Sequence, residues 1–62
     1  MDYMTRIDLQ GKDHWNNMLI WCNENFGEVK VRWAAINYAD ASATFMFKNE
    51  DDLTVFKLSW IG

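Results

Sequence analysis

The stretch EVKVRWAAINYADASATFMFK, residues 28–48, decides the fold. Apolar and polar side chains alternate over residues 28–37, which is typical of a half-buried strand. Residues 42–48 alternate again, and one face of that strand would carry Ala43, Phe45 and Phe47. The residues between, 38–41, include Asp40 and have the length of a hairpin turn. The pattern predicts an antiparallel hairpin.

A strand and a helix are predicted before the hairpin. Residues 3–9 alternate, with Tyr3, Thr5, Ile7 and Leu9 on one parity. Asp13 is a candidate helix cap, and the helix after it has one apolar stripe, formed by Trp15, Met18, Leu19, Cys22 and Phe26. Gly27 follows as the left-handed residue that commonly ends a helix.

The segment after the hairpin has two readings. Asn49 followed by three acids resembles a helix cap and an acidic first turn, and a helix would place Leu53, Phe56 and Trp60 on one face. Phe56, Leu58 and Trp60 also alternate as a strand would. The capping signal favours the helix for residues 53–61.

These elements predict an α+β fold of the order β-α-β-β-α in one domain, residues 1–62. We expect a truncated ferredoxin-like sandwich, with a three-stranded sheet and two helices on one face. A right-handed crossover is expected to set the first strand parallel to the third, which lies in the middle. The open face of the sheet would carry Met4, Arg6, Asp8, Lys30, Arg32, Ala34, Ser42, Thr44 and Met46.

Composition excludes several classes of function. The chain has 62 residues and a net charge of −3, which argues against generic polyanion binding. Cys22 has no partner for a disulfide, and one Cys with one His is too few for a zinc site. No motif for catalysis or cofactor binding is present, so we expect neither an enzyme nor a cofactor or metal. The chain shows neither a signal peptide nor a membrane-spanning run, which predicts a cytoplasmic protein.

The first candidate site is the open sheet face, where Arg6, Lys30 and Arg32 would cluster. RNA-recognition modules stack bases on aromatic side chains of such a face, but the matching positions here are Ser42 and Thr44, which cannot stack a base. A solvated polar face is the simpler reading, and a protein or small-ligand contact is the alternative.

The second and third candidates lie on the helices. Trp21 shares a helix flank with His14, Asn17 and Asn25, where it either folds over the edge of the core or anchors a partner. The last helix carries Val55 and Leu58 roughly opposite its core face. A helix that is apolar nearly all round is usually buried nearly all round, which favours self-association or a bound partner.

The residues FMFKNEDDLTVFKLSW (45–60), together with KDHW (12–15) and WCNENFG (21–27), resemble small early proteins of tailed bacteriophages. That resemblance implies a protein that binds and disables a component of its host, with the host cytoplasm as its location. It assigns a role to no residue.

The leading hypothesis is therefore a non-enzymatic interaction protein that binds and inhibits a host protein, for example a component of host defence. One alternative is a homo-oligomeric sponge for a small signalling nucleotide, using Arg6, Lys30, Arg32 and an aromatic such as Trp33 or Trp21. Another alternative is an RNA-binding regulator that resembles an RNA-recognition module.

Overall fold

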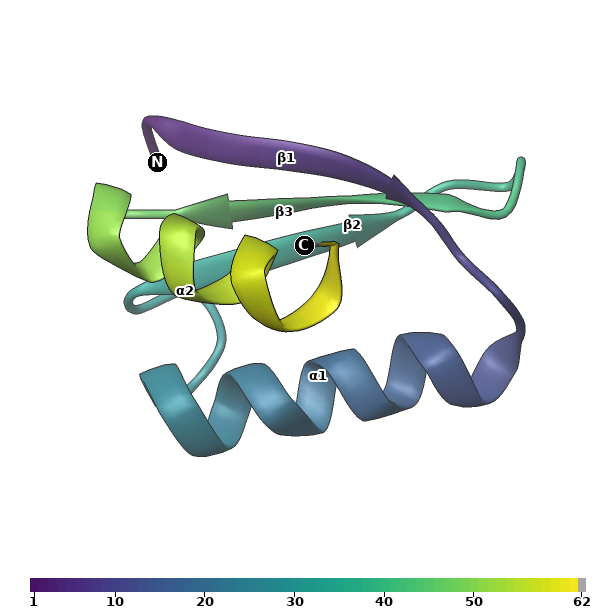
Figure 1. Cartoon of the computed structure of the whole chain (residues 1–62), viewed down its shortest axis with the longest axis horizontal. Coiled ribbons are helices and arrows are strands. Elements are labelled where there is room, and N and C mark those ends of the chain that lie inside the picture. The colour runs from purple at the N-terminus through teal and green to yellow at the C-terminus, as the bar shows by residue number, and fades with distance from the viewer. Residues whose placement is uncertain (62) are drawn as a thin grey trace.

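The computed structural model describes residues 1–61. The elements follow one another as β1 (Tyr3–Asp8), α1 (Lys12–Phe26), β2 (Trp33–Asn37), β3 (Ser42–Phe47) and α2 (Glu50–Trp60) (Figure 1). The expected β-α-β-β-α order and the small ferredoxin-like α+β architecture are confirmed. The last segment is a helix, with Asn49 at its N-cap position and three acids in its first turn.

The sheet has the strand order β1-β3-β2, and β3 is antiparallel to both neighbours. The central place of β3 is as expected, but its direction relative to β1 is not. A helical crossover returns the chain to its starting end, so β2 runs in the direction of β1 (Figure 1). The hairpin turn then reverses the chain, and β3 pairs between β1 and β2. The expected parallel pairing of the first and third strands is therefore wrong.

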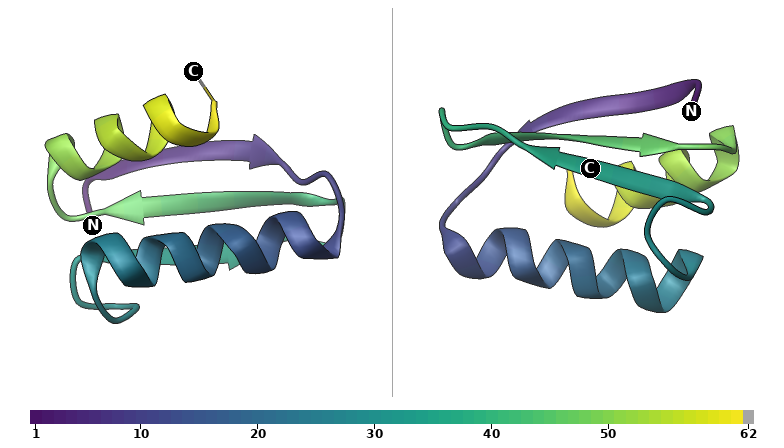
Figure 2. Two further views of the ribbon diagram at one scale, coloured as in Figure 1. Left: turned by 60° about the horizontal axis from the view of Figure 1, so that its bottom comes forward. Right: turned by 180° about the vertical axis from the view of Figure 1, so that it is seen from behind.

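Both helices cover one face of the sheet, with α1 beside β2 and α2 beside β1 (Figure 2). Between helices and sheet lies a core rich in aromatic residues, formed by Met18, Cys22, Phe26, Trp33, Ala43, Phe45, Phe47 and Phe56. Phe56 stacks on Phe45 with ring centroids 4.6 Å apart, and it also contacts Phe47 at 5.3 Å. Large rings supply much of the apolar burial that so short a chain needs.

The second strand begins five residues later than the alternation predicts. Residues 28–32 form a turn in which Lys30 has a φ of 73° and donates its backbone N–H to the Trp33 carbonyl. The alternating pattern misleads here because a left-handed residue interrupts the extended backbone. Lys30 and Arg32 consequently lie outside the sheet and not on its open face.

The ends of α1 and the hairpin turn can also be compared with the predictions. Helix α1 starts after Gly11, so Asp13 lies in the first turn and is not the cap. Gly27 ends this helix with the expected positive φ of 88°. The hairpin turn spans residues 38–41 as expected, and Ala41 adopts a φ of 64° at its end.

Candidate binding groove

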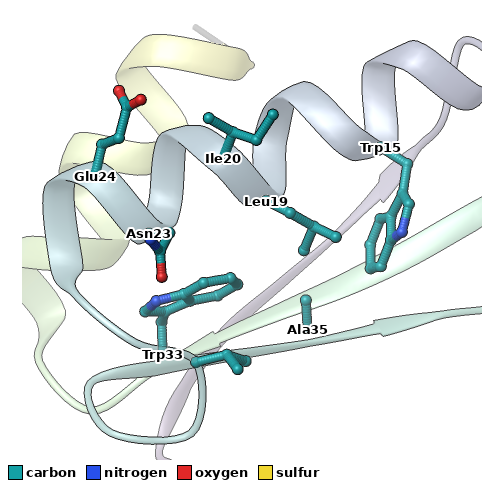
Figure 3. A pocket seen from close by; sticks show the side chains of 8 residues that line it. Trp15, Leu19, Ile20, Asn23, Glu24, Trp33 and Ala35 are labelled. Atoms are coloured by element: carbon teal, nitrogen blue, oxygen red, sulfur yellow. The ribbon is translucent and has the colours of Figure 1, made fainter.

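A groove of about 520 Å³ lies between α1 and β2. Its walls are largely apolar and consist of Trp15, Leu19, Ile20, Asn23, Glu24, Val29, Trp33 and Ala35. In Figure 3, Trp15 and Leu19 reach from α1 toward Ala35 of β2, and Asn23 points to the Trp33 ring. Pockets of this size and composition commonly bind apolar groups.

The floor of the groove is rigid. Trp33 is almost fully buried, and its indole Nε1 donates to the Gly27 carbonyl at 2.8 Å. Its ring stacks on Phe45 with a centroid distance of 6.5 Å. The rim is exposed by contrast, because Ile20 is 56% and Val29 is 49% exposed. Apolar rim residues around a fixed aromatic floor favour contact with another molecule.

One edge of β2 beside this groove has free backbone groups. Tyr38 N–H bonds to the Ser42 carbonyl and Lys48 N–H to the Arg32 carbonyl, so even-numbered residues of β2 pair with β3. The N–H and C=O groups of Ala35 and Asn37 therefore point away from β3. Within residues 1–61 they have no backbone partner. An unpaired strand edge is a template for a further strand.

The groove continues past Trp15 toward the hairpin. A second hollow of about 430 Å³ shares Trp15 with the first and lies against Asn37 and Tyr38 at one side and Lys12 and Asn16 at the other. The two hollows together follow α1 and β2 over most of the strand. Their arrangement fits an extended chain better than a compact ligand.

The charge at one end of the groove is negative. Glu24 belongs to its lining and lies close to the C-terminus of α1. The last turn of that helix has no basic residue to offset the negative end of its dipole. A cationic side chain is therefore the favoured occupant of that end.

The three basic residues of the first predicted site are not brought together. Arg6 donates to Asp40 and Ser42 at 2.9 Å and lies over the Tyr38 ring, next to the hairpin turn. The Ser42 hydroxyl and the Arg6 charge lower the pKa of Asp40. Lys30 is exposed in the turn before β2.

Arg32 lies at the other end of the sheet. It forms an ion pair with Asp52 at 2.9 Å, and its guanidinium carbon is 5.7 Å from the centre of the Phe26 ring. Each of the two arginines thus already has a carboxylate partner within the chain.

The helix-flank candidates take structural positions. Trp21 is half-buried, and its ring makes edge contacts with Phe26 at 5.5 Å and with Phe56 and Trp60 at 6.1 Å. It therefore packs between the two helices. Asn25 donates to the Trp21 carbonyl at 2.8 Å. This geometry matches the reading in which Trp21 folds over the core edge.

His14 has two contacts within the chain. Its Nδ1 accepts the Gln10 N–H at 3.0 Å, and its ring lies 5.7 Å from that of Trp60. A polar hollow of about 460 Å³ next to it is lined by residues that include Arg6, Asp8 and Trp60. Trp60 Nε1 is buried without a hydrogen-bond partner among the described residues.

Val55 and Leu58 remain on the surface, 46% and 72% exposed. The helix α2 is therefore buried on one side only in a single copy. Neither residue lines any of the three hollows described above.

Chemically reactive groups are few in the part of the chain that the structure describes. Burial raises the pKa of the Cys22 thiol to about 12, so it stays protonated. In residues 1–61 no three His, Cys, Asp or Glu side chains are placed to hold a metal ion. No described helix is long and apolar enough to cross a membrane.

The groove itself was not predicted from the sequence. Two residues of the sequence could have indicated the groove. Ile20 is an apolar residue outside the buried stripe of α1, and Val29 lies in a segment whose alternation predicts a strand. Neither shows which surfaces meet, because the groove exists only once α1 has packed beside β2.

No protein-family model matches the chain, and no curated protein or solved structure is significantly similar to it.

Proposed function

We propose that this is a non-enzymatic binding protein that holds an extended segment of another protein in the groove between α1 and β2. The observation that carries the proposal is the combination of an apolar groove with free backbone groups at Ala35 and Asn37 beside it. Proteins with this combination bind peptides by strand addition, in which backbone hydrogen bonds supply affinity and side-chain pockets supply specificity.

The chemistry of the occupant follows from the groove. Its alternate side chains would be apolar, to fill the hollows on both sides of Trp15. One end would carry Lys or Arg near Glu24 and the C-terminus of α1. A net charge of −3 on the whole chain favours the approach of a basic segment.

The resemblance to small early phage proteins supports a host protein as the source of this segment. If the host protein needs that apolar segment for another contact, a bound copy of this protein would block the contact. The host protein would then be inhibited without any covalent reaction. No specific contact favours a nucleotide sponge or an RNA regulator, since Arg6 and Arg32 are paired at opposite ends of the sheet.

The proposal is tested by selecting binders from a displayed library of random nonapeptides and synthesising the enriched ones. Alternating apolar residues with a terminal Lys or Arg are expected. Titration calorimetry then compares Ile20→Asp, at the groove rim, with Leu58→Asp, at another exposed helix position away from the groove.

Binding is expected to weaken at least tenfold in Ile20→Asp and to stay unchanged in Leu58→Asp. Each variant is first checked for folding by circular dichroism, because both place an acid in a helix. Peptides that bind Ile20→Asp as well as the unchanged protein would refute the groove as the site, as would a selection that enriches nothing.

A further inference from the structure

The other edge of the sheet, β1, is open over a longer run than β2. Leu9 N–H bonds to the Ala41 carbonyl, so the odd-numbered residues of β1 pair with β3. The N–H and C=O groups of Met4, Arg6 and Asp8 therefore face away from the sheet. In residues 1–61 no backbone group pairs with them, whereas at β2 the turn at Lys30 already bonds to Trp33.

We infer that β1 pairs antiparallel with β1 of a second copy, in the register that sets Arg6 opposite Asp8 of that copy. The two chains would be related by a twofold axis between their Ile7 residues. Each Arg6–Asp8 pair would exchange both of its backbone hydrogen bonds. The product is a continuous six-stranded sheet.

Charge selects this register over its neighbours. Arg6 and Asp8 point to the same face of β1, because they are two residues apart. If one β1 strand slides along the other by one pair in one direction, Arg6 lies opposite Arg6 of the second copy. If it slides one pair further, Asp8 lies opposite Asp2 of the second copy. Like charges directly opposite one another destabilise a strand pair, whereas opposite charges stabilise it.

The side chains are available for these contacts. Arg6 uses its Nη2 for Asp40 and Ser42, and among residues 1–61 its Nε and Nη1 donate to no other group. A guanidinium can serve two carboxylates in this way. Asp8 is exposed, and within the described residues it has no ion-pair or side-chain hydrogen-bond partner.

Within the bounds of β1, this register overlaps residues 6–8 of the two copies and sets Ile7 opposite Ile7, an apolar contact on the face of the sheet that packs against the core. This surface is distinct from the peptide groove, which lies at the opposite edge of the sheet.

The test is sedimentation velocity over a wide concentration range, up to the millimolar level. The unchanged protein is expected to sediment as a dimer at the upper end. Asp8→Arg is expected to weaken the dimer at least tenfold, and the double variant Arg6→Asp with Asp8→Arg is expected to restore it. Asp51→Arg, at an exposed position on α2, is the matched control and should dimerise normally.

Cysteine pairing tests the register and does not depend on the charge variants folding. Arg6→Cys and Asp8→Cys proteins, mixed under mild oxidation, should form a disulfide between unlike chains, because residues opposite in a hydrogen-bonded pair have Cα atoms about 5.5 Å apart. Neither variant alone should cross-link efficiently. A monomer at all concentrations, an unaffected Asp8→Arg dimer, a double variant that folds without dimerising, or Arg6→Cys cross-linking to itself would each overturn the inference.

Discussion

Arg32 and Asp52 form a bidentate ion pair that ties the turn before β2 to the first turn of α2. Arg32 Nη2 lies 2.9 Å from Asp52 Oδ1, and Arg32 Nε lies 3.2 Å from Oδ2. The carboxylate side is nearly buried, at 10% exposure, and the guanidinium is half exposed. The pair thereby connects the start of β2 to the start of α2.

Replacing Asp52 with Asn is expected to lower the free energy of unfolding by about 1–2 kcal/mol, because charge-assisted hydrogen bonds to a nearly buried carboxylate are lost. Urea denaturation measures the change. Asp51→Asn removes an exposed acid of the same helix turn and should cost less than about 0.5 kcal/mol. Equal losses in the two variants would mean that only the helix dipole is involved.

Ala41→Gly is expected to stabilise the protein by about 1 kcal/mol. Ala41 has a φ of 64°, where a Cβ atom is strained and glycine is not. Ala39→Gly, in the same turn but without a positive φ, should instead destabilise by about 0.5–1 kcal/mol, because glycine loses more conformational entropy on folding. The midpoint of urea unfolding is compared for both, and a loss at Ala41 would contradict the turn geometry.

Phe56→Ala is expected to cost about 3–5 kcal/mol, a large part of the stability of a small domain. The ring is fully buried and contacts Phe45, Phe47 and Trp21. Leu58→Ala, on the exposed side of the same helix, should change stability by less than about 0.5 kcal/mol. Thermal unfolding followed by near-ultraviolet circular dichroism separates the two, and similar melting temperatures would be inconsistent with this core.

The raised pKa of the Cys22 thiol predicts that the free energy of unfolding falls at alkaline pH. Its folded-state pKa, about 12, lies above the ordinary value of 9.0, so the folded state keeps the thiol proton longer than the unfolded state does. The corresponding contribution to stability is complete below pH 9 and is lost as the pH rises toward 12.

The Cys22→Ala variant should lack that part of the pH dependence. The difference in stability between the variant and the unchanged protein therefore reports the contribution of Cys22 alone. Under native conditions at neutral pH, the thiol should react with an aromatic disulfide reagent only through opening of the fold. Complete labelling within the mixing time would show that Cys22 is accessible and its pKa ordinary.

The sequence was sufficient to predict the elements because periodicity and caps are local properties. The stripe from Trp15 to Phe26 identified α1, and the acids after Asn49 identified α2 against the competing strand pattern. These features need no knowledge of distant contacts.

The features that were missed depend on contacts between distant residues or on single backbone angles. The direction of β1 relative to β3 follows from two reversals of the chain, through α1 and through the hairpin. The late start of β2 rests on the positive φ of Lys30, which alternation of side chains does not reveal. The separation of Arg6 from Arg32 is a consequence of both.

The central position of β3 also orders the assembly of the sheet in time. Strand β2 meets β3 across a short turn, but Tyr3 of β1 must find Phe47, 44 residues later in the chain. Closing the longer loop costs more entropy and slows the step, so we expect the hairpin to form first and β1 to dock last.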